Sequence, residues 1–302
     1  MKTSISHTLI IIFVLISTPY LMAQKDTPPF QLPEGVQILK DLPYGKGGNR
    51  TLHLDLYLHP IENDLHPGII FIHGGGWRGG SRNQFRGQAA YLAEKGYVGA
   101  CIEYRLSGEA KFPAAVEDAK CAVRWMRANA KKYNIDPDCI AAVGGSAGGH
   151  LASMLGVTDG KSEFEGTGGY PDYSSKVNIV VSFNGVADLR PVSFQKKVPR
   201  AILSFLGGTF KELPEIYSKA SPITYVNKDD PPFLFIHGTE DKTVPHQQSV
   251  DFQTALKKAG VHAELYSVEG QSHGFFNRSP WYKDTLKRME AFLDAHLKKA
   301  AH

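Results

Sequence analysis

Hydrophobic and polar residues alternate strictly near the start of the chain. Every second residue from Leu52 to Leu58 is a leucine, and the residues between them are polar or aromatic. This two-residue period is typical of a half-buried strand. We expect residues 50–60 to form that strand and to pair with residues 36–45 as a hairpin, joined through the turn Gly45–Gly48.

Further along, short apolar runs alternate with stretches of helical periodicity. The predicted strands cover residues 67–72, 97–104, 139–143, 177–183, 232–236 and 263–268. The predicted helices cover residues 84–95, 113–131, 147–155, 246–259 and 280–299. In the second of these helices, apolar residues from Val116 to Met126 recur every three or four positions and would pack on a sheet. This alternation predicts an α/β fold, doubly wound around a mostly parallel sheet, in which ligands bind at the carboxyl ends of the strands.

The length and composition fit a single domain. The chain has 302 residues, of which 42% are hydrophobic, and this is enough for one large core. We expect residues 24–302 to form that domain, with the less regular stretch 187–225 as a small lid insert. The formal net charge of +4 is too small to indicate a nucleic-acid partner. Neither property indicates an oligomeric state.

The first 23 residues have the pattern of a signal peptide. Lys2 is followed by eight apolar residues, Leu9–Ile16, and the small residue Ala23 precedes the polar Gln24. Eight residues are too few to cross a hydrocarbon layer about 30 Å thick. We therefore expect cleavage after Ala23, export to the periplasm or the medium, and no stable membrane insertion. An uncleaved membrane anchor is the alternative interpretation.

The cysteines and histidines indicate no metal site. There are three cysteines, Cys101, Cys121 and Cys139, so at least one lacks a disulfide partner within the chain. We expect all three to be small buried side chains. No histidine and cysteine stand at a spacing typical of metal ligands. The sequence therefore predicts neither a metal nor an organic cofactor.

A serine flanked by glycines follows one of the predicted strands. Residues 144–149 read Gly-Gly-Ser-Ala-Gly-Gly, directly after the apolar run 139–143. In a tight strand-to-helix turn, side chains two positions either side of the serine would collide with neighbouring backbone, and glycine avoids this collision. The Ser146 hydroxyl would then project at the head of a helix, where backbone amides and the helix dipole assist a nucleophile. An incidental serine in a glycine-rich turn is the alternative.

Three more features follow predicted strands in the same way. Residues 73–77 read His-Gly-Gly-Gly-Trp, and bare glycine amides of this kind can approach a ligand closely and form part of an oxyanion hole. Asp241 and His273 each lie just past the end of a later strand. The chain order Ser146, Asp241, His273 is that of a catalytic triad on an open α/β sheet.

Other side chains compete for two of these roles. The competitors are the acids Glu240 and Asp188 and the histidines His150, His237 and His246. We prefer Asp241 because it lies one strand before His273, as the expected chain order requires. His150 lies on the helix that follows the serine, and His237 lies at a strand end, so packing, or hydrogen bonding to a catalytic residue from behind, suits them better.

Five motifs together resemble those of the α/β-hydrolase superfamily. They are HGGGW at 73–77, EYRLSGEAKFPAAVEDA at 103–119, GGSAGGH at 144–150, HGTEDKTVP at 237–245 and GQSHGF at 270–275. More narrowly, the chain resembles bacterial esterases of the hormone-sensitive-lipase-like group and exported esterases that remove acetyl or feruloyl groups from plant polysaccharides. The resemblance extends from about residue 36 to residue 298.

This resemblance implies a role for each motif residue. Ser146 would be the nucleophile, His273 the general base and acid, and Asp241 the carboxylate that orients the imidazole. The oxyanion hole would be formed by the amides of Gly75, Gly76 and Ala147. We expect Trp77 and Phe112 to form walls of the substrate pocket.

The chain departs from the hormone-sensitive-lipase-like pattern at its N-terminus. That group carries a helical cap, whereas Pro28, Pro29 and Pro33 forbid a regular helix within residues 24–35. An open cleft suits a bulky polymer with small acyl groups, so we expect an ester linked to a polysaccharide as the substrate. The alternatives are a general short-chain carboxylesterase, a serine exopeptidase of related fold, and a catalytically inactive adhesive relative.

Overall fold

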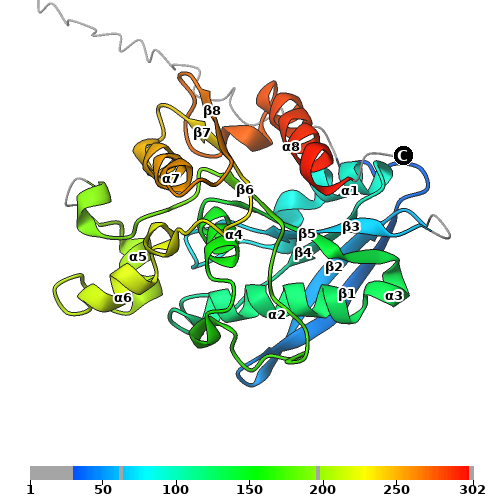
Figure 1. The fold of residues 1–302 in the computed structure, drawn as a ribbon, viewed down its shortest axis with the longest axis horizontal. Coiled ribbons are helices and arrows are strands. Elements are labelled where there is room, and N and C mark those ends of the chain that lie inside the picture. Colours follow the sequence, from blue (N-terminus) through cyan, green and yellow to red (C-terminus); the bar gives the residue numbers. More distant parts are fainter. Residues whose placement is uncertain (1–29, 61–63, 195–197, 299–302) are drawn as a thin grey trace, which may run out of the picture.

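The computed structural model describes residues 30–60, 64–194 and 198–298, so the predicted signal peptide, residues 1–23, lies outside the described residues. An eight-stranded sheet forms the centre, in the order β1-β2-β4-β3-β5-β6-β7-β8 (Figure 1). The strands are β1 (Gln37–Gly47), β2 (Arg50–Leu58), β3 (His66–Ile72), β4 (Val98–Ile102), β5 (Ile135–Gly145), β6 (Ile179–Phe183), β7 (Phe233–Gly238) and β8 (Ala263–Val268). Strands β3 to β8 run parallel, whereas β2 is antiparallel to both β1 and β4.

Helices cover both faces of the sheet (Figure 1). They are α1 (Arg86–Glu94), α2 (Ala114–Ala128), α3 (Ala130–Tyr133), α4 (Ala147–Val157), α5 (Arg200–Leu206), α6 (Pro214–Lys219), α7 (Gln247–Lys258) and α8 (Trp281–Leu297). Side chains of α1 and α8 join the hydrophobic core on one face, and side chains of α2, α4 and α7 join the core on the other. The predicted doubly wound, mostly parallel α/β fold is confirmed.

Strand β3 shows how the sequence pattern produces two cores. Ile70 and Ile72 belong to the core beneath α2 and α4, while Ile69 and Phe71 belong to the core beneath α1 and α8. All four are at most 1% exposed. A parallel strand that is buried on both faces reads as one continuous apolar run, which is why residues 67–72 stand out in the sequence.

The N-terminal hairpin also forms as predicted, with β1 antiparallel to β2. Strand β5 begins four residues before the predicted 139, because Ile135 and Asp136 pair with the start of β3. Cys101 in β4 is buried, in agreement with the sequence, whereas Cys139 in β5 is only half-buried.

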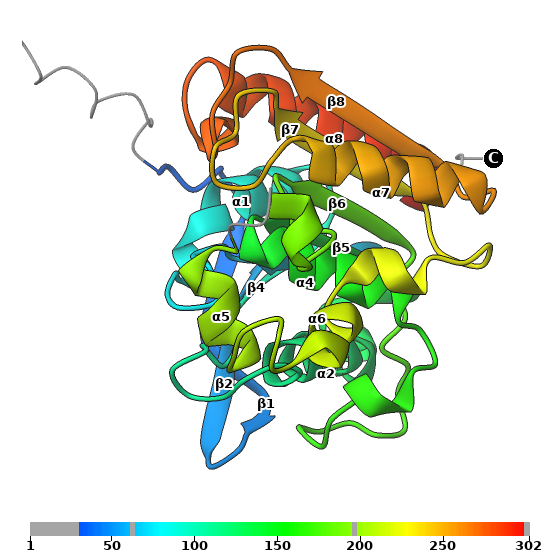
Figure 2. The ribbon, with the colours of Figure 1, turned by 90° about the vertical axis from the view of Figure 1, so that its left-hand side faces the viewer.

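The described residues of the stretch predicted as a lid insert, 187–194 and 198–225, are largely helical. They contain α5 and α6 and two short 3-10 turns, η3 (Pro191–Phe194) and η4 (Pro222–Tyr225). Figure 2 shows α5 and α6 on the side of the molecule that faces the viewer, and η4 of this insert contacts α4. A hydrogen bond of 2.7 Å from His150 Nε2 in α4 to the carbonyl oxygen of Ala220 fixes this insert to the helix that follows Ser146.

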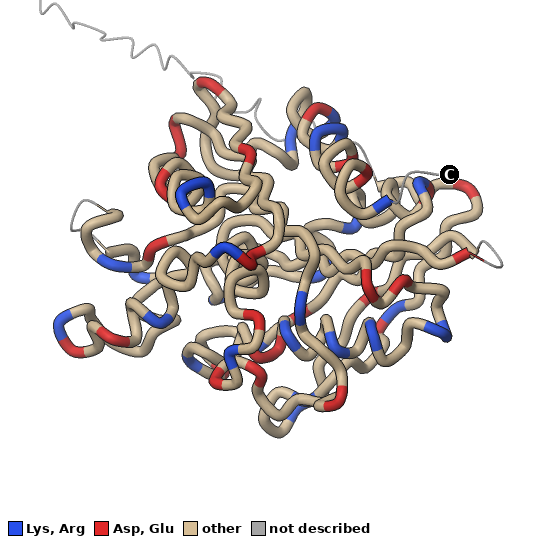
Figure 3. Tube along the Cα trace, viewed as in Figure 1, with Lys and Arg blue, Asp and Glu red and all other residues tan. Residues whose placement is uncertain are grey.

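Charged residues of both signs are interspersed along the chain (Figure 3). Within residues 30–60, 64–194 and 198–298, no helix combines the length and the apolar character needed to cross a membrane.

Candidate active site

Ser146 lies in a sharp turn between β5 and α4. Its backbone φ of 56° is in the left-handed region, where a residue with a side chain is strained by about 1 to 3 kcal/mol. The backbone can adopt this turn only because two neighbouring positions are glycines. A Cβ on Gly144 would lie 2.1 Å from the carbonyl oxygen of Gly148, and a Cβ on Gly148 would lie 2.0 Å from that of Ile72. The predicted strand-to-helix turn is therefore present, and it presents a half-exposed Ser146 side chain at the start of α4.

The structure brings Ser146, His273 and Asp241 together from three loops. His273 Nε2 lies 2.9 Å from Ser146 Oγ, and His273 Nδ1 lies 2.6 Å from Asp241 Oδ2. Asp241 follows the end of β7, and His273 follows the end of β8. Because parallel strands end at the same edge of the sheet, these loops meet there and form one continuous hydrogen-bonded chain.

Asp241 is buried and fully hydrogen-bonded. It is 7% exposed, and its Oδ1 accepts the backbone N–H groups of Thr243 at 2.8 Å and Val244 at 2.9 Å. Burial by itself would raise the pKa of Asp241, but hydrogen bonds from His237 and His273 outweigh it and hold the pKa well below its usual range. The carboxylate is therefore charged at neutral pH and can orient the His273 ring.

The glycine loop after β3 runs directly against this turn. A Cβ on Gly74 would lie 2.7 Å from the carbonyl oxygen of Gly145 and 3.2 Å from Ser146 Cβ. Gly75 and Gly76, predicted donors of the oxyanion hole, have φ values of 112° and 60°. Any side chain on Gly75 would also meet the carbonyl oxygen of Gly79, at 2.2 Å. The third predicted donor, Ala147, is the first residue of α4 and follows Ser146 directly.

Two side chains that the sequence did not single out hold this loop in place. Gln84 Oε1 accepts the N–H of Gly74. The Tyr104 hydroxyl donates to the carbonyl oxygen of His73 at 3.0 Å, and the two rings stack with centroids 4.4 Å apart. Gln84 lies in an exposed polar stretch and Tyr104 at a strand end, so neither carries a sequence signal for this role.

Trp77 is not a pocket wall, and the sequence prediction for it is wrong. Its side chain is 2% exposed because the indole stacks on Phe205 of α5, with centroids 4.5 Å apart. The indole N–H donates to Nδ1 of His150 at 3.3 Å. Phe112 is half-buried beside Phe205, with ring centroids 5.8 Å apart, so its contact with substrate stays a prediction.

The competing acids lie elsewhere. Asp188 is held by Arg190 through two hydrogen bonds of 2.8 Å, and Glu240 is exposed. The histidine that bonds Ser146, His273, has Asp241 as its carboxylate partner.

The competing histidines have structural partners. His150 is fully buried between Trp77 and Ala220, and burial lowers its pKa to about 4. His237 bonds Ser249 through Nδ1 at 2.7 Å, and its Nε2 lies 3.2 Å from Asp241. His150 therefore has the expected packing role, whereas His237 contacts the catalytic Asp241 from behind, which is the other role expected for these two histidines.

A glycine-flanked nucleophile turn and a Ser-His-Asp chain at the carboxyl edge of a doubly wound sheet define the α/β-hydrolase class. Within that class, the chain belongs to the BD-FAE family, whose profile matches residues 54–256.

Similar proteins are named as esterases. Esterase LipQ of Mycobacterium tuberculosis is 32% identical over 245 residues, which cover 78% of this chain and 57% of LipQ. A truncated carbohydrate esterase from gut microbiota is 32% identical, with a TM-score of 0.75, and the match covers 87% of this chain and 97% of that one. The butyrate-bound esterase Est2 of Thermogutta terrifontis is 33% identical, with a TM-score of 0.73. The match covers 89% of this chain and 97% of Est2. The chain spans about half the length of the curated relatives it matches.

Proposed function

We propose that this protein is a serine carboxylic ester hydrolase that works through an acyl-enzyme. The observation that carries the proposal is the hydrogen-bonded chain from Ser146 Oγ through His273 to Asp241, with distances of 2.9 and 2.6 Å. Both distances lie within the reach needed for proton transfer and for orientation of the base. The names of the similar proteins support the same activity.

The geometry accounts for two acyl transfers. His273 removes the hydroxyl proton as Ser146 Oγ attacks the ester carbonyl, and the amides of the glycine loop and of Ala147 stabilise the oxyanion. His273 then returns the proton to the departing alcohol, and the acyl group remains on Ser146. Water, activated by His273, releases the acid in the same way. Each oxyanion donor contributes about 3 kcal/mol to lowering the barrier.

The substrate that we propose is an acetyl or feruloyl ester on a plant-type polysaccharide. The resemblance to exported carbohydrate esterases and the likeness to a structure named as a carbohydrate esterase support it. The second candidate is a short alkyl ester, as for a general carboxylesterase, and the butyrate in the similar Est2 structure favours it. Acetate and ferulate release from a panel of polysaccharides separates the two. Activity on short alkyl esters alone would reject the polysaccharide substrate.

The proposed activity is tested by comparing the wild type with Ser146→Ala. We expect hydrolysis of 4-nitrophenyl acetate to fall by about 10⁴-fold or more in the variant, because no nucleophile replaces the hydroxyl. An amino-acyl 4-nitroanilide serves as the peptidase substrate. Ester turnover that survives the substitution would refute the assignment of Ser146. Preferential cleavage of the anilide would indicate an exopeptidase, and no turnover of either substrate by the wild type would indicate an inactive relative.

We further propose that the protein is exported. The basis is the signal-peptide pattern of residues 1–23. Expression of the full chain in a Gram-negative host, followed by N-terminal sequencing of the periplasmic fraction, should give a protein that starts at Gln24. A membrane-bound product that still starts at Met1 would support the uncleaved anchor instead.

A further inference from the structure

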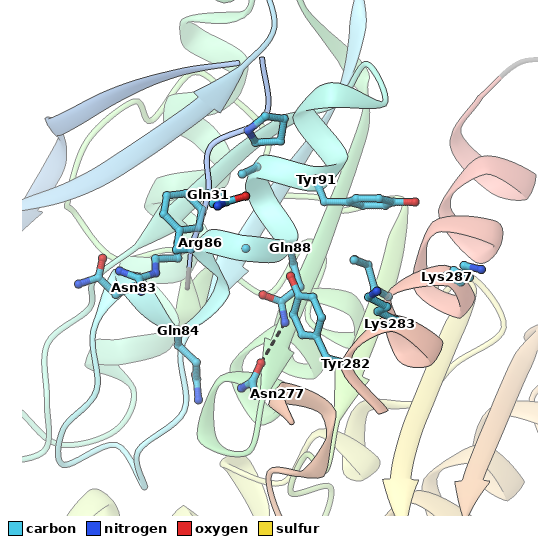
Figure 4. A pocket seen from close by; sticks show the side chains of 15 residues that line it. Gln31, Asn83, Gln84, Arg86, Gln88, Tyr91, Asn277, Tyr282, Lys283 and Lys287 are labelled. Atoms are coloured by element: carbon cyan, nitrogen blue, oxygen red, sulfur yellow. Dashed lines mark hydrogen bonds between the residues drawn. The ribbon is translucent and has the colours of Figure 1, made fainter. Parts of the chain in front are cut away.

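A cavity of about 590 Å³ lies between α1, the first half of α8 and the described N-terminal residues 30–33. We call it the α1–α8 groove. Figure 4 shows that its side chains come from α1, with Gln88 and Tyr91, and from α8, with Tyr282 and Lys283, and Phe30 also lines it. None of these residues belongs to the Ser146 site.

The groove is rich in carboxamide side chains. Five of them line it: Gln31, Asn83, Gln84, Gln88 and Asn277. A carboxamide can donate and accept hydrogen bonds at once, as a sugar hydroxyl does. Gln88 is only 3% exposed and donates to Asn277 at 3.0 Å, so part of this polar lining is already held in place. Together with aromatic rings, such a lining suits a polyhydroxylated ligand better than an alkyl chain.

The charges that line the groove are all positive. They belong to Arg86, Lys283 and Lys287, and no aspartate or glutamate is among the lining residues. In the described part of the chain, no carboxylate forms an ion pair with any of the three. The Arg86 guanidinium lies over the Phe30 ring, 4.9 Å from its centroid. All three side chains are exposed, so a ligand carboxylate that enters the groove can pair with them.

Three carboxylates of neighbouring segments have partners within the protein. Glu290 accepts the Tyr91 hydroxyl at 2.6 Å. A smaller neighbouring hollow contains Asp41 and Asp55, and both of these are paired with Arg82, at 2.6 and 2.8 Å. Arg86 lines this hollow as well as the groove, so the cations with no carboxylate in their shared lining are Lys283 and Lys287.

The groove borders the loops that carry the candidate active site. Gln84, in its wall, accepts the N–H of Gly74 in the glycine loop. Asn277, on its other side, ends the 3-10 turn η5 (Phe275–Asn277), which follows His273 closely. These two segments connect the groove with the loops around Ser146, so a long polymer chain can extend from one to the other.

We propose that the α1–α8 groove binds a uronic-acid-bearing segment of the polysaccharide whose ester is hydrolysed at Ser146. This inference rests on the proposed function. The sugar carboxylate would pair with the cations of α1 and α8, and the carboxamides would bond the ring hydroxyls. A charge-assisted pair contributes more than a neutral hydrogen bond, so an acidic sugar should bind more tightly than a neutral one of equal length.

Calorimetric titration of the full chain carrying Ser146→Ala tests this without hydrolysis. The acidic probe is xylotriose bearing one 4-O-methylglucuronic acid, the neutral probe is xylotetraose, and decanoate represents a lipid-like acid. We expect the acidic sugar to bind at least about tenfold more tightly than the neutral one, and the difference to shrink as sodium chloride is added. Equal binding of the two sugars, no binding of either, or tighter binding of decanoate would overturn the proposal.

Matched charge deletions locate the site. In the Ser146→Ala background, the double substitution Lys283→Ala and Lys287→Ala should weaken binding of the acidic probe at least about tenfold. Lys257→Ala with Lys258→Ala removes the same charge from exposed positions on α7 and should leave binding unchanged. Equal effects of the two pairs would overturn the proposal. Since binding is measured without Ser146, failure of ester hydrolysis in the wild type would reject the proposed function separately.

Discussion

Single glycines decide whether the backbone can adopt the turn that exposes the Ser146 side chain. The strain of its positive φ persists because β5 and α4 pack closely around the turn. Gly148 has the least room, since a Cβ there would lie 2.0 Å from a backbone carbonyl oxygen of β3, which cannot move without breaking the sheet.

Gly148→Ala should therefore be strongly destabilising, by about 4 kcal/mol or more, or should prevent folding. Gly108→Ala is the matched control, because a Cβ there meets nothing within 4 Å. Thermal unfolding should show a large fall in midpoint for the first variant and almost no change for the second. Similar midpoints for both would show that the turn is less tightly packed than described.

Gln84 is a positioning residue for the glycine loop, through its bond to the Gly74 N–H. Gln84→Ala should lower kcat for 4-nitrophenyl acetate by about tenfold with little change in KM, because a displaced loop weakens oxyanion stabilisation. Gln84→Glu keeps an acceptor oxygen and should recover most of kcat. A change confined to KM, or no recovery by glutamate, would contradict this role.

At the scale of elements, the insert is docked onto the glycine loop through Trp77. The indole stacks on Phe205 of α5 and bonds His150 of α4, which in turn bonds Ala220 beyond α6. One buried ring therefore joins three segments: the loop after β3, the helix that follows Ser146, and the insert.

Substitution of Trp77 distinguishes a buried anchor from a pocket wall. Trp77→Ala should lower the free energy of unfolding by about 3 to 5 kcal/mol, since it opens a cavity and leaves His150 without its donor. Trp77→Phe keeps the stacking and should lower the free energy of unfolding by a smaller amount. Urea unfolding measures both. A raised KM with unchanged stability would instead restore Trp77 as a substrate contact.

At the scale of the whole molecule, buried histidines make stability depend on pH. Burial lowers the pKa of His150 to about 4 and also lowers the pKa of His73. In the unfolded chain a histidine titrates near 6.5. Between these two values the unfolded state binds a proton that the folded state does not, so stability falls as pH falls.

From pH 7 to pH 5, His150 alone should reduce the free energy of unfolding by about 2 kcal/mol. His150→Gln offers an acceptor for the Trp77 N–H and a donor for Ala220, but it does not titrate. Urea unfolding at the two pH values should therefore show a smaller decrease for this variant than for the wild type. An equal decrease in both proteins would place the titration elsewhere.

The sequence by itself determined the order of strands and helices and most of the candidate site. Strands buried on both faces leave continuous apolar runs, and the glycines around Ser146 form a local motif that is typical of a strand-to-helix turn. Asp241 and His273 could be picked out because each closely follows a strand whose end is visible in the sequence.

Only the tertiary structure decided how distant segments pack. The burial of Trp77 depends on where α5 of the insert lies, and the support of Gly74 by Gln84 depends on the path of the chain before α1. The cations of α1 and α8 line one groove only because both helices cover the same face of the sheet. Local patterns reflect the environment of each element on its own, whereas these contacts arise from the crossing of elements that are far apart in the chain.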